Sequence, residues 1–169
     1  MSAMKKSPLD VCVICSGNIC RSPYAEAVIR RAVAGQGWED HVKVRSAGTL
    51  QIVGQPAHEM TLNVAAERGL NLIAFRSSAL DDTCLAEADL IIALGREHLP
   101  WLRKRIPAAP PHVWLITAPG EAEPPEDDPG ILDPVGFGDD DYRVALDAID
   151  ATISRVIEAI GVLAGLPTR

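Results

Sequence analysis

A short apolar run that passes directly into a turn and a helix start constrains the fold of this chain more than any other feature. The run is LDVCVIC at residues 9–15, the turn is SGNICR at residues 16–21, and Ser22 and Pro23 follow at once. Ser22 is a favourable N-cap residue and Pro23 a favourable first helical residue, so we expect a helix to begin there. The segment predicts a buried strand, a tight loop and a helix in succession. The residues that would share one apolar face of this helix are Ala25, Val28, Ile29 and Ala32.

Three further apolar runs predict buried strands. They lie at residues 42–47 (VKVRSA), 89–94 (DLIIAL) and 112–116 (HVWLI). Nearly continuous apolar runs are typical of a parallel sheet that is covered on both faces. Helical patterns separate these runs, and strands that alternate with helices indicate an α/β fold with right-handed crossovers. We therefore expect a single domain over residues 1–169, with a central four-stranded parallel sheet flanked by helices on both faces.

The helical patterns differ in how clearly they end. Residues 57–68 carry an apolar stripe, and Gly69 is a natural stop after it. Residues 142–160 repeat apolar side chains with helical period over a long stretch. In the segment after the third run, Pro100 predicts either a kink or the start of a new turn. Residues 117–141 are rich in proline, glycine and acidic residues, which predicts a long loop that is either functional or disordered.

The composition narrows the class of protein. The chain has 169 residues, of which 47% are hydrophobic and 23% charged, as expected for one globular domain with a sizeable core. The formal net charge of −7 argues against a nucleic-acid partner or an anionic membrane surface, because phosphates are bound by clustered Lys and Arg. The apolar run after MSAMKKSPLD is too short for a secretory signal or a membrane span. We therefore expect a soluble cytoplasmic domain.

The loop at residues 16–21 has the features of an anion site. Ligands of parallel α/β sheets bind beyond the carboxyl ends of the strands, where helix N-termini offer unpaired N–H groups. Gly17 and Asn18 tolerate positive φ, which helps successive N–H groups to point at one centre. Arg21 can add two parallel hydrogen bonds to a tetrahedral oxyanion. The expected phosphate-binding residues besides Arg21 are Ser16, Gly17, Asn18, Ile19, Cys20 and Ser22.

Cys15 is expected to face the same centre as the loop amides. The start of the helix, Arg21 and the hydroxyl of Ser22 should all favour the thiolate form of Cys15. A thiolate beneath a bound phosphate is a nucleophile aimed at phosphorus. The alternative interpretation is an inert buried thiol on a strand, with Arg21 on the surface.

The stretch CSGNICRSP at residues 15–23 resembles the C-x5-R-(S/T)-P signature of the low-molecular-weight protein tyrosine phosphatases. The similarity extends along almost the whole chain. It includes SAG at residues 46–48, ADLIIALGREHL at 88–99 and DPVGFGDDDYR at 133–143, in the order expected for that family. The resemblance implies a phosphatase that acts on tyrosine-phosphorylated proteins and needs neither a metal ion nor another cofactor.

The resemblance also implies a role for each matching residue. Cys15 would form a phosphocysteine, Arg21 and the loop amides would hold the phosphoryl oxygens, and Ser22 would stabilise the thiolate. Asn18, bonded to Ser46, would keep the loop in shape.

The general acid of the family belongs to an Asp-Pro pair, and this chain has two such pairs. They are Asp128-Pro129 and Asp133-Pro134. The glycine and the later Tyr142 that follow in the family pattern match the second pair. We therefore select Asp133 as the general acid, with Asp128 as its rival.

The chain departs from the family around the expected substrate cleft. The segment after SAG has no aromatic residue, Val135 stands after the Asp-Pro pair, and Ala93 and Gly95 stand where relatives often have Met and Asp. The cleft would be walled by Leu50, Val135 and Phe137, which makes it less aromatic. This leaves phosphoarginine as an alternative substrate, although relatives with that activity prefer Thr at the position of Ile19.

Two other functions compete with protein phosphatase activity. Thioredoxin-linked arsenate reductases share the fold and the loop, but they need two further cysteines, and only Cys84 lies beyond the loop in this chain. A phosphate-binding module with weak or no catalysis is the second alternative.

The remaining cysteines and the histidines suggest no metal site. Cys12 and Cys15 form a C-x-x-C pattern, but residues three apart on a strand point to opposite faces, so Cys12 is interpreted as core. Cys20 is either a small packing residue or the partner of Cys15 in a reversible protective disulfide. Cys84 is interpreted as structural. The histidines are interpreted as surface or capping residues, namely His41, His58, His98 and His112.

Overall fold

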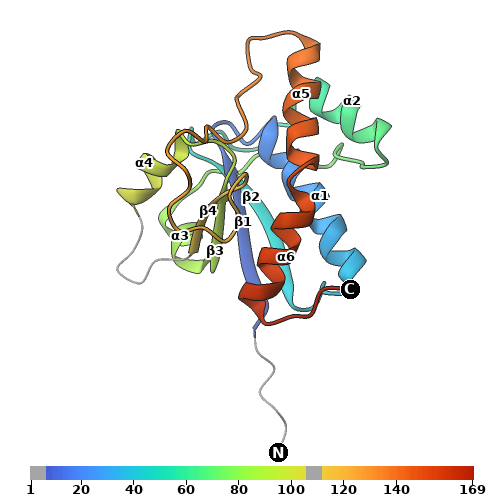
Figure 1. Ribbon diagram of the computed structural model, residues 1–169. Coiled ribbons are helices and arrows are strands. Elements are labelled where there is room, and N and C mark those ends of the chain that lie inside the picture. The colour runs from blue at the N-terminus through green and yellow to red at the C-terminus, as the bar shows by residue number, and fades with distance from the viewer. Residues whose placement is uncertain (1–6, 106–111) are drawn as a thin grey trace, which may run out of the picture.

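The predicted sheet is present. The computed structural model describes residues 7–105 and 112–169, so residues 1–6 and 106–111 of the expected domain lie outside the described ranges. The sheet has four parallel strands in the order β2-β1-β3-β4 (Figure 1). Their bounds are Leu9–Cys15 for β1, Val42–Gly48 for β2, Leu90–Ala93 for β3 and His112–Leu115 for β4. The four apolar runs therefore correspond to the four strands.

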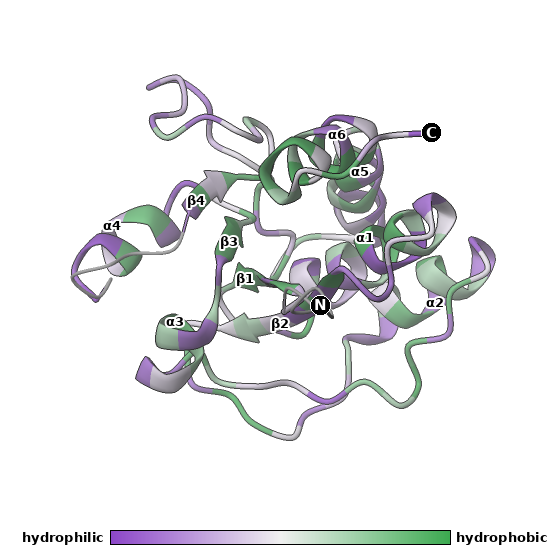
Figure 2. Cartoon of the chain, turned by 90° about the horizontal axis from the view of Figure 1, so that it is seen from below, coloured by the Kyte–Doolittle hydropathy of each residue, from purple (hydrophilic) through white to green (hydrophobic). Residues whose placement is uncertain are grey.

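Helices cover both faces of the sheet, as predicted. One side has α1 (Arg21–Gln36), α2 (Glu59–Glu67), α5 (Asp139–Asp150) and α6 (Ile153–Ala164), and the other has α3 (Asp82–Glu87) and α4 (His98–Arg103). Figure 2 shows the two groups on either side of the strands. Within the described residues, none of the helices is both long and apolar enough to cross a membrane.

Strand β1 is the centre of the packing. Its residues from Val11 to Cys15 are almost fully buried, and they alternate between two hydrophobic cores. Val13 and Cys15 belong to the core beneath α1, α5 and α6, whereas Cys12 belongs to the core beneath α3 and α4. This alternation follows from the two-residue period of a strand. The prediction that Cys12 and Cys15 point to opposite faces is confirmed.

Helix α1 starts earlier than predicted. It begins at Arg21, with Cys20 in the N-cap position and no side-chain capping bond. The predicted capping role of Ser22 is therefore wrong. The Ser22 hydroxyl instead contacts the sulfur of Cys15, so a side chain that would suit a helix cap is used by the loop.

The C-terminal helical pattern is divided between α5 and α6. Ala151 and Thr152 separate them, and the Thr152 hydroxyl donates to the carbonyl of Ile149 at 2.7 Å. Such a bond to a preceding carbonyl competes with helix continuation. Both helices keep their apolar faces on the same core through residues such as Ile149 and Val156, so the apolar period continues across the break.

The loop before α5, residues 117–138, is rich in acidic residues and is called the acidic loop below. It is bonded to the end of β3. Gly130 pairs with Gly95 in an antiparallel bridge, and the N–H of Ile131 donates to the carbonyl of Leu94 at 2.7 Å. Gly130 has a φ of 71°, and a Cβ there would lie 2.6 Å from the same carbonyl oxygen. Glycine is therefore needed at this close approach. The fastening brings the residues after Ile131 to the carboxyl edge of the sheet, where β1 also ends.

Candidate active site

The loop after β1 is shaped around Asn18. Asn18 is buried and has a left-handed backbone conformation with a φ of 56°. Its amide nitrogen donates to the hydroxyls of Ser22 at 2.8 Å and Ser46 at 2.9 Å, and its amide oxygen accepts from the N–H of Ser78 at 2.8 Å. The expected contact with Ser46 is thus present. Gly17 does not have positive φ, so the left-handed turn of this loop is made by Asn18.

The end of β2 supports the loop from below. A Cβ at Gly48 would lie 2.6 Å from the carbonyl oxygen of Ser16 and 2.9 Å from the nitrogen of Asn18. The N–H of Thr49 donates to the carbonyl of Cys15 at 3.1 Å, and that of Leu50 donates to the carbonyl of Ser16 at 2.9 Å. The loop therefore rests directly on the backbone of β2.

Two donors converge on the sulfur of Cys15. The backbone N–H of Asn18 donates to Cys15 Sγ at 3.2 Å, and Ser22 Oγ lies 3.0 Å from the same atom. Because Ser22 Oγ already accepts from the Asn18 side chain, its own O–H is free to point at the sulfur. Donors of this kind stabilise negative charge on sulfur.

Arg21 is buried among carboxylates and carbonyls beside the loop. Only 1% of it is exposed. Its Nη1 donates to the carbonyl of Ile131 at 2.7 Å and to Glu97 Oε1 at 3.1 Å, and its Nη2 lies 3.4 Å from Asp133 Oδ2. A buried guanidinium needs such partners to offset its desolvation. The structure thus brings together Arg21 and Asp133 from opposite ends of the chain.

Glu97 was not anticipated from the sequence. A Cβ at Gly95 would lie 2.1 Å from Glu97 Oε2, so the carboxylate occupies the space that a side chain at position 95 would fill. Gly95 is the position where relatives often have Asp. The carboxylate of Glu97 lies in the space that an Asp side chain at position 95 would enter. The only hint in the sequence was the missing Asp itself.

His98 corrects a second expectation. It is 2% exposed, whereas we interpreted it as a surface or capping residue. Its Nδ1 accepts from the N–H of Gly95 at 3.1 Å, so its Nε2 carries the proton and donates to Ser16 Oγ at 3.1 Å. Burial lowers the pKa of His98, which keeps the ring neutral. His98 thus connects the end of β3 to the first residue of the loop.

The two candidate general acids have different surroundings. Asp128 accepts from the hydroxyl of Thr117 at 2.8 Å and from the N–H of Gly130 at 2.9 Å, so both its oxygens hold the acidic loop in place. Asp133 is 40% exposed, and its Oδ1 accepts from the N–H of Val135 at 3.0 Å while Oδ2 faces Arg21. Asp133 is therefore the acid that faces both the site and solvent.

The three expected cleft residues are all exposed. The exposed fraction is 63% for Leu50, 54% for Val135 and 69% for Phe137. Leu50 adjoins the loop through its backbone bond to Ser16. Phe137 and Asp133 line the same hollow of about 400 Å³, which extends towards α5. Exposed apolar side chains are therefore present near the site, but only Phe137 lines this hollow together with Asp133.

Cys20 faces a tyrosine. Its sulfur lies 3.7 Å from Tyr142 Oη, and burial raises the pKa of Cys20 to about 11. His58 stacks on the Tyr142 ring at 4.6 Å and donates its backbone N–H to the carbonyl of Ile19 at 2.7 Å. These contacts support the far side of the loop. The four cysteines are free thiols, and a Cys15–Cys20 disulfide stays a prediction.

The site as a whole is suited to one kind of chemistry. A sulfur with two donors stands at the end of a buried strand, and helix α1 begins a few residues later at the buried Arg21. An exposed carboxylate faces the guanidinium of Arg21. These are the features that a phosphate-binding loop with a cysteine nucleophile requires. Among residues 7–105 and 112–169, no group of three His, Cys, Asp or Glu side chains is arranged to hold a metal ion.

Comparison with known proteins gives the family. The family model for low molecular weight phosphotyrosine protein phosphatase matches residues 10–162. A probable low molecular weight protein-tyrosine-phosphatase, EpsP of Ralstonia solanacearum, is 32% identical over 152 residues, which cover 89% of this chain and 97% of that protein. The chain therefore belongs to the low molecular weight phosphotyrosine protein phosphatase family, whose members are cysteine-dependent enzymes.

Two solved structures agree with this assignment. The tyrosine phosphatase Wzb from Escherichia coli K30, in complex with sulphate, shares 27% identity and a TM-score of 0.75, over 90% of this chain and 99% of that one. Wzb from Vibrio vulnificus, in complex with benzylphosphonate, shares 25% identity and a TM-score of 0.72, over 86% of this chain and 94% of that one. The predicted family and fold are confirmed.

Proposed function

We propose that this enzyme dephosphorylates tyrosine-phosphorylated proteins and that Cys15, Arg21 and Asp133 carry the reaction. The observation that supports it most directly is the convergence of the Asn18 N–H and the Ser22 hydroxyl on the sulfur of Cys15. That arrangement makes sulfur both a competent nucleophile and a stable leaving group. The other loop residues, Ser16, Gly17, Ile19 and Cys20, would contribute backbone N–H groups to the phosphoryl oxygens.

In the first step, the Cys15 thiolate attacks phosphorus in line with the leaving oxygen. The sulfur–phosphorus bond forms as the bond to the phenolic oxygen breaks, and Asp133 donates a proton to that oxygen. Arg21 and the loop amides neutralise the charge on the three equatorial oxygens. Arg21 supplies a positive charge and the loop amides supply N–H donors, so the step requires no metal ion.

In the second step, water attacks the phosphocysteine and Asp133 accepts its proton. The sulfur–phosphorus bond breaks, and the Cys15 thiolate returns to its two donors. Inorganic phosphate then leaves the loop. The same carboxyl group thus serves as acid and then as base, which its solvent-exposed position permits.

The depth of the site supports an aromatic phosphate ester as substrate. Cys15 and Arg21 are 2% and 1% exposed, so the phosphate must descend well below the surface to reach them. A phenyl ring can span that depth and pack on Leu50 and Val135, whereas the short side chain of phosphoserine cannot. The benzylphosphonate complex of Vibrio vulnificus Wzb, in which an aromatic ring is joined to a phosphonate, is consistent with this choice.

The surroundings of Cys84 argue against arsenate reduction. Cys84 packs against the face of the sheet opposite to Cys15, so it is poorly placed to accept a disulfide from the nucleophile.

We place the enzyme in the cytoplasm, since its thiols are free and a reducing compartment such as the cytoplasm keeps thiols reduced.

Hydrolysis of p-nitrophenyl phosphate and of three phosphopeptides in the presence of EDTA tests this proposal. We expect turnover of the phosphotyrosine peptide to exceed that of phosphoserine and phosphoarginine peptides. Cys15→Ser should remove turnover by several orders of magnitude, whereas Cys84→Ser, on the opposite face, should retain it. Preferential hydrolysis of phosphoarginine, or equal loss in both variants, would overturn the proposal.

A further inference from the structure

A second pair of thiols lies on the opposite side of the sheet from the catalytic cysteine. The sulfurs of Cys12, on β1, and Cys84, on α3, are 3.8 Å apart although the residues are 72 positions apart in the sequence. Cys12 is completely buried, and Cys84 is 8% exposed. Both residues are buried, and Cys84 is the one that retains some contact with solvent.

A guanidinium group stands directly beside this pair. Arg45 on β2 is the register partner of Cys12 on β1, so both side chains lie on the same face of the sheet. Arg45 Nη1 donates to Cys84 Sγ, and Nη2 donates to the carbonyl of Cys84 at 3.3 Å. Asp10 fixes the guanidinium through bonds of 2.9 and 3.2 Å to Nε and Nη2. The cation is thus held against one sulfur.

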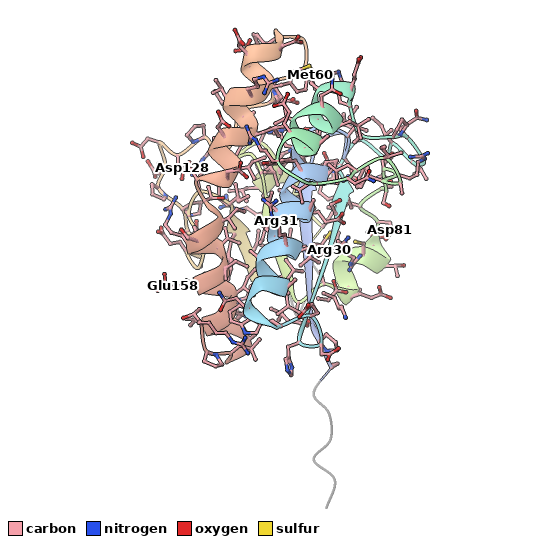
Figure 3. The ribbon with its side chains drawn as sticks, turned by 90° about the vertical axis from the view of Figure 1, so that its right-hand side faces the viewer. Arg30, Arg31, Met60, Asp81, Asp128 and Glu158 are labelled. Carbon is pink, nitrogen blue, oxygen red and sulfur yellow. The ribbon has the colours of Figure 1, made fainter. Side chains whose placement is uncertain are left out.

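The two thiols differ in acidity. The hydrogen bond with Cys12, followed by the charge of Arg45, lowers the pKa of Cys84 to about 7. The same bond and burial raise the pKa of Cys12. Asp81, labelled in Figure 3, accepts from the Cys84 N–H at 2.7 Å, and its charge opposes the thiolate, as that of Asp10 does at Cys12. Cys84 is therefore the more acidic of the two thiols, and Cys12 is the one that keeps its proton more strongly.

We propose that Cys84 and Cys12 form a peroxide-sensitive thiol pair, in which Cys84 reacts first and Cys12 resolves the product to a disulfide. The oxidant is a hydroperoxide. The Cys84 thiolate attacks one peroxide oxygen, the O–O bond breaks, and the leaving oxygen departs as water or an alcohol after taking up a proton. This step leaves a sulfenic acid on Cys84 and reduces the peroxide by two electrons.

The second step uses the neighbouring thiol. Cys12 sulfur attacks Cys84 sulfur, the S–O bond breaks, and the hydroxyl leaves as water with the proton of Cys12. The sulfurs must approach from 3.8 Å to about 2.05 Å, a movement that the short, peripheral helix α3 has to supply. Cys15 takes no part, because it lies in the other core. The disulfide would join α3 to the central strand.

The test uses a Cys15→Ser/Cys20→Ser variant, in which Cys12 and Cys84 are the only thiols left. After treatment with one equivalent of hydrogen peroxide, we expect a peptide crosslink between residues 12 and 84 by mass spectrometry. Adding Cys12→Ser should leave a sulfenic acid on Cys84 that dimedone traps. Adding Cys84→Ser should leave Cys12 unmodified, because it is buried and protonated.

Arg45→Gln tests the role of the guanidinium. We expect it to slow carbamidomethylation of Cys84 at about pH 6 by roughly tenfold, since below the pKa each unit of pKa changes the thiolate fraction about tenfold. Lys43→Gln is the matched control, because Lys43 lies two residues away on the same strand and bonds to the carbonyl of Glu39. It should leave the rate unchanged.

A second measurement covers the case in which the double variant does not fold. Wild-type protein saturated with inorganic phosphate, which protects the catalytic loop, is treated with peroxide and mapped in the same way, and the 12–84 crosslink is again expected. Absence of that crosslink in folded protein, oxidation of Cys84 to sulfinic acid without it, or equal alkylation rates in both arginine and lysine variants would overturn the proposal.

Discussion

A single buried arginine is shared by two carboxylates at this site. Glu97 and Asp133 both contact Arg21, and the first of them reaches it because Gly95 has no side chain. Glu97 therefore orients the guanidinium, but its charge would also repel a phosphate dianion bound beside Arg21. These two effects can be separated by substitution.

The Glu97→Gln variant keeps a hydrogen-bond acceptor and removes the charge. We expect inorganic phosphate to inhibit it more strongly, by roughly fivefold to tenfold, because about 1 kcal/mol of like-charge repulsion is removed. Glu97→Ala removes the acceptor as well, and its kcat/KM should fall by about tenfold because Arg21 loses a fixed partner. Identical inhibition constants in the two variants would show that Glu97 does not position Arg21.

The leaving-group dependence of turnover distinguishes the two aspartates. Asp133→Asn keeps the acceptor for the Val135 N–H and should lower kcat for a phosphotyrosine peptide by roughly 10²-fold or more. The loss for p-nitrophenyl phosphate should be smaller, because its leaving group needs less protonation. Asp128→Asn should instead lower the free energy of unfolding by about 1 kcal/mol, since it disturbs the bond to Thr117. The reverse pattern would exclude Asp133 as the acid.

The neutral state of His98 makes stability depend on pH. Because burial lowers its pKa in the folded protein, the unfolded chain takes up this proton at a higher pH than the folded one does. The stability associated with the neutral ring is complete above the ordinary histidine pKa and is lost as the pH falls below it. Urea unfolding from about pH 8 to about pH 5 should therefore show a steeper loss in wild type than in His98→Gln. Parallel curves would contradict this assignment.

At the scale of elements, alanine substitutions at two glycines are expected to affect activity differently. Gly48→Ala places a Cβ within 2.6 Å of the Ser16 carbonyl oxygen, so the loop must move. We expect a loss of kcat/KM of roughly 10²-fold, because misplacement by about 1 Å has that effect on positioned groups. Phosphatase assays at several substrate concentrations would measure it.

Gly35→Ala is the matched control. Position 35 lies inside α1, and nothing lies within 4 Å of a Cβ there. This variant should gain about 0.5–1 kcal/mol of stability with unchanged activity, because alanine loses less entropy in a helix. Equal activity of the two variants would mean that β2 does not set the shape of the loop.

Much of the order of strands, loops and helices was predictable from the sequence, because buried strands and a loop signature are local sequence patterns. Residues 9–15 contain both the strand and the proposed nucleophile, so the fold and the proposed chemistry could be inferred from the same stretch. The break between α5 and α6 was not predictable, since the apolar period continues across Thr152. Glu97 was missed because its contact depends on space left by another residue, and the Cys12–Cys84 contact was missed because it spans 72 positions.

At the scale of the whole molecule, the site is assembled from segments that are distant in the chain. Arg21 contacts Glu97 and the carbonyl of Ile131, and Ser16 contacts His98, so the ends of β1 and β3 and the acidic loop all meet there. A ligand in the loop should therefore stabilise the entire fold rather than one segment. Binding that is confined to the folded state acts in this way.

Phosphate should raise the unfolding temperature through this coupling. At 100 times its Kd, the expected stabilisation is about 2.7 kcal/mol, which corresponds to several degrees. Cys15→Ser should retain this shift, because the loop amides and Arg21 stay in place. Arg21→Lys should lose most of it, since an ammonium group cannot form the two parallel bonds of a guanidinium. Scanning calorimetry with and without phosphate would detect both results.

The odd spacing between Cys12 and Cys15 has a consequence for how the chain can vary. Side chains three residues apart on a strand lie on opposite faces of the sheet, so the sheet separates Cys12 and Cys84 from Cys15. Deleting one residue between them would put both side chains on the same face of the sheet, so one of the two sulfurs would lose its partners, either Cys84 and Arg45 or the loop donors. The length of this short segment is therefore as strictly constrained as the identity of the cysteine at its end.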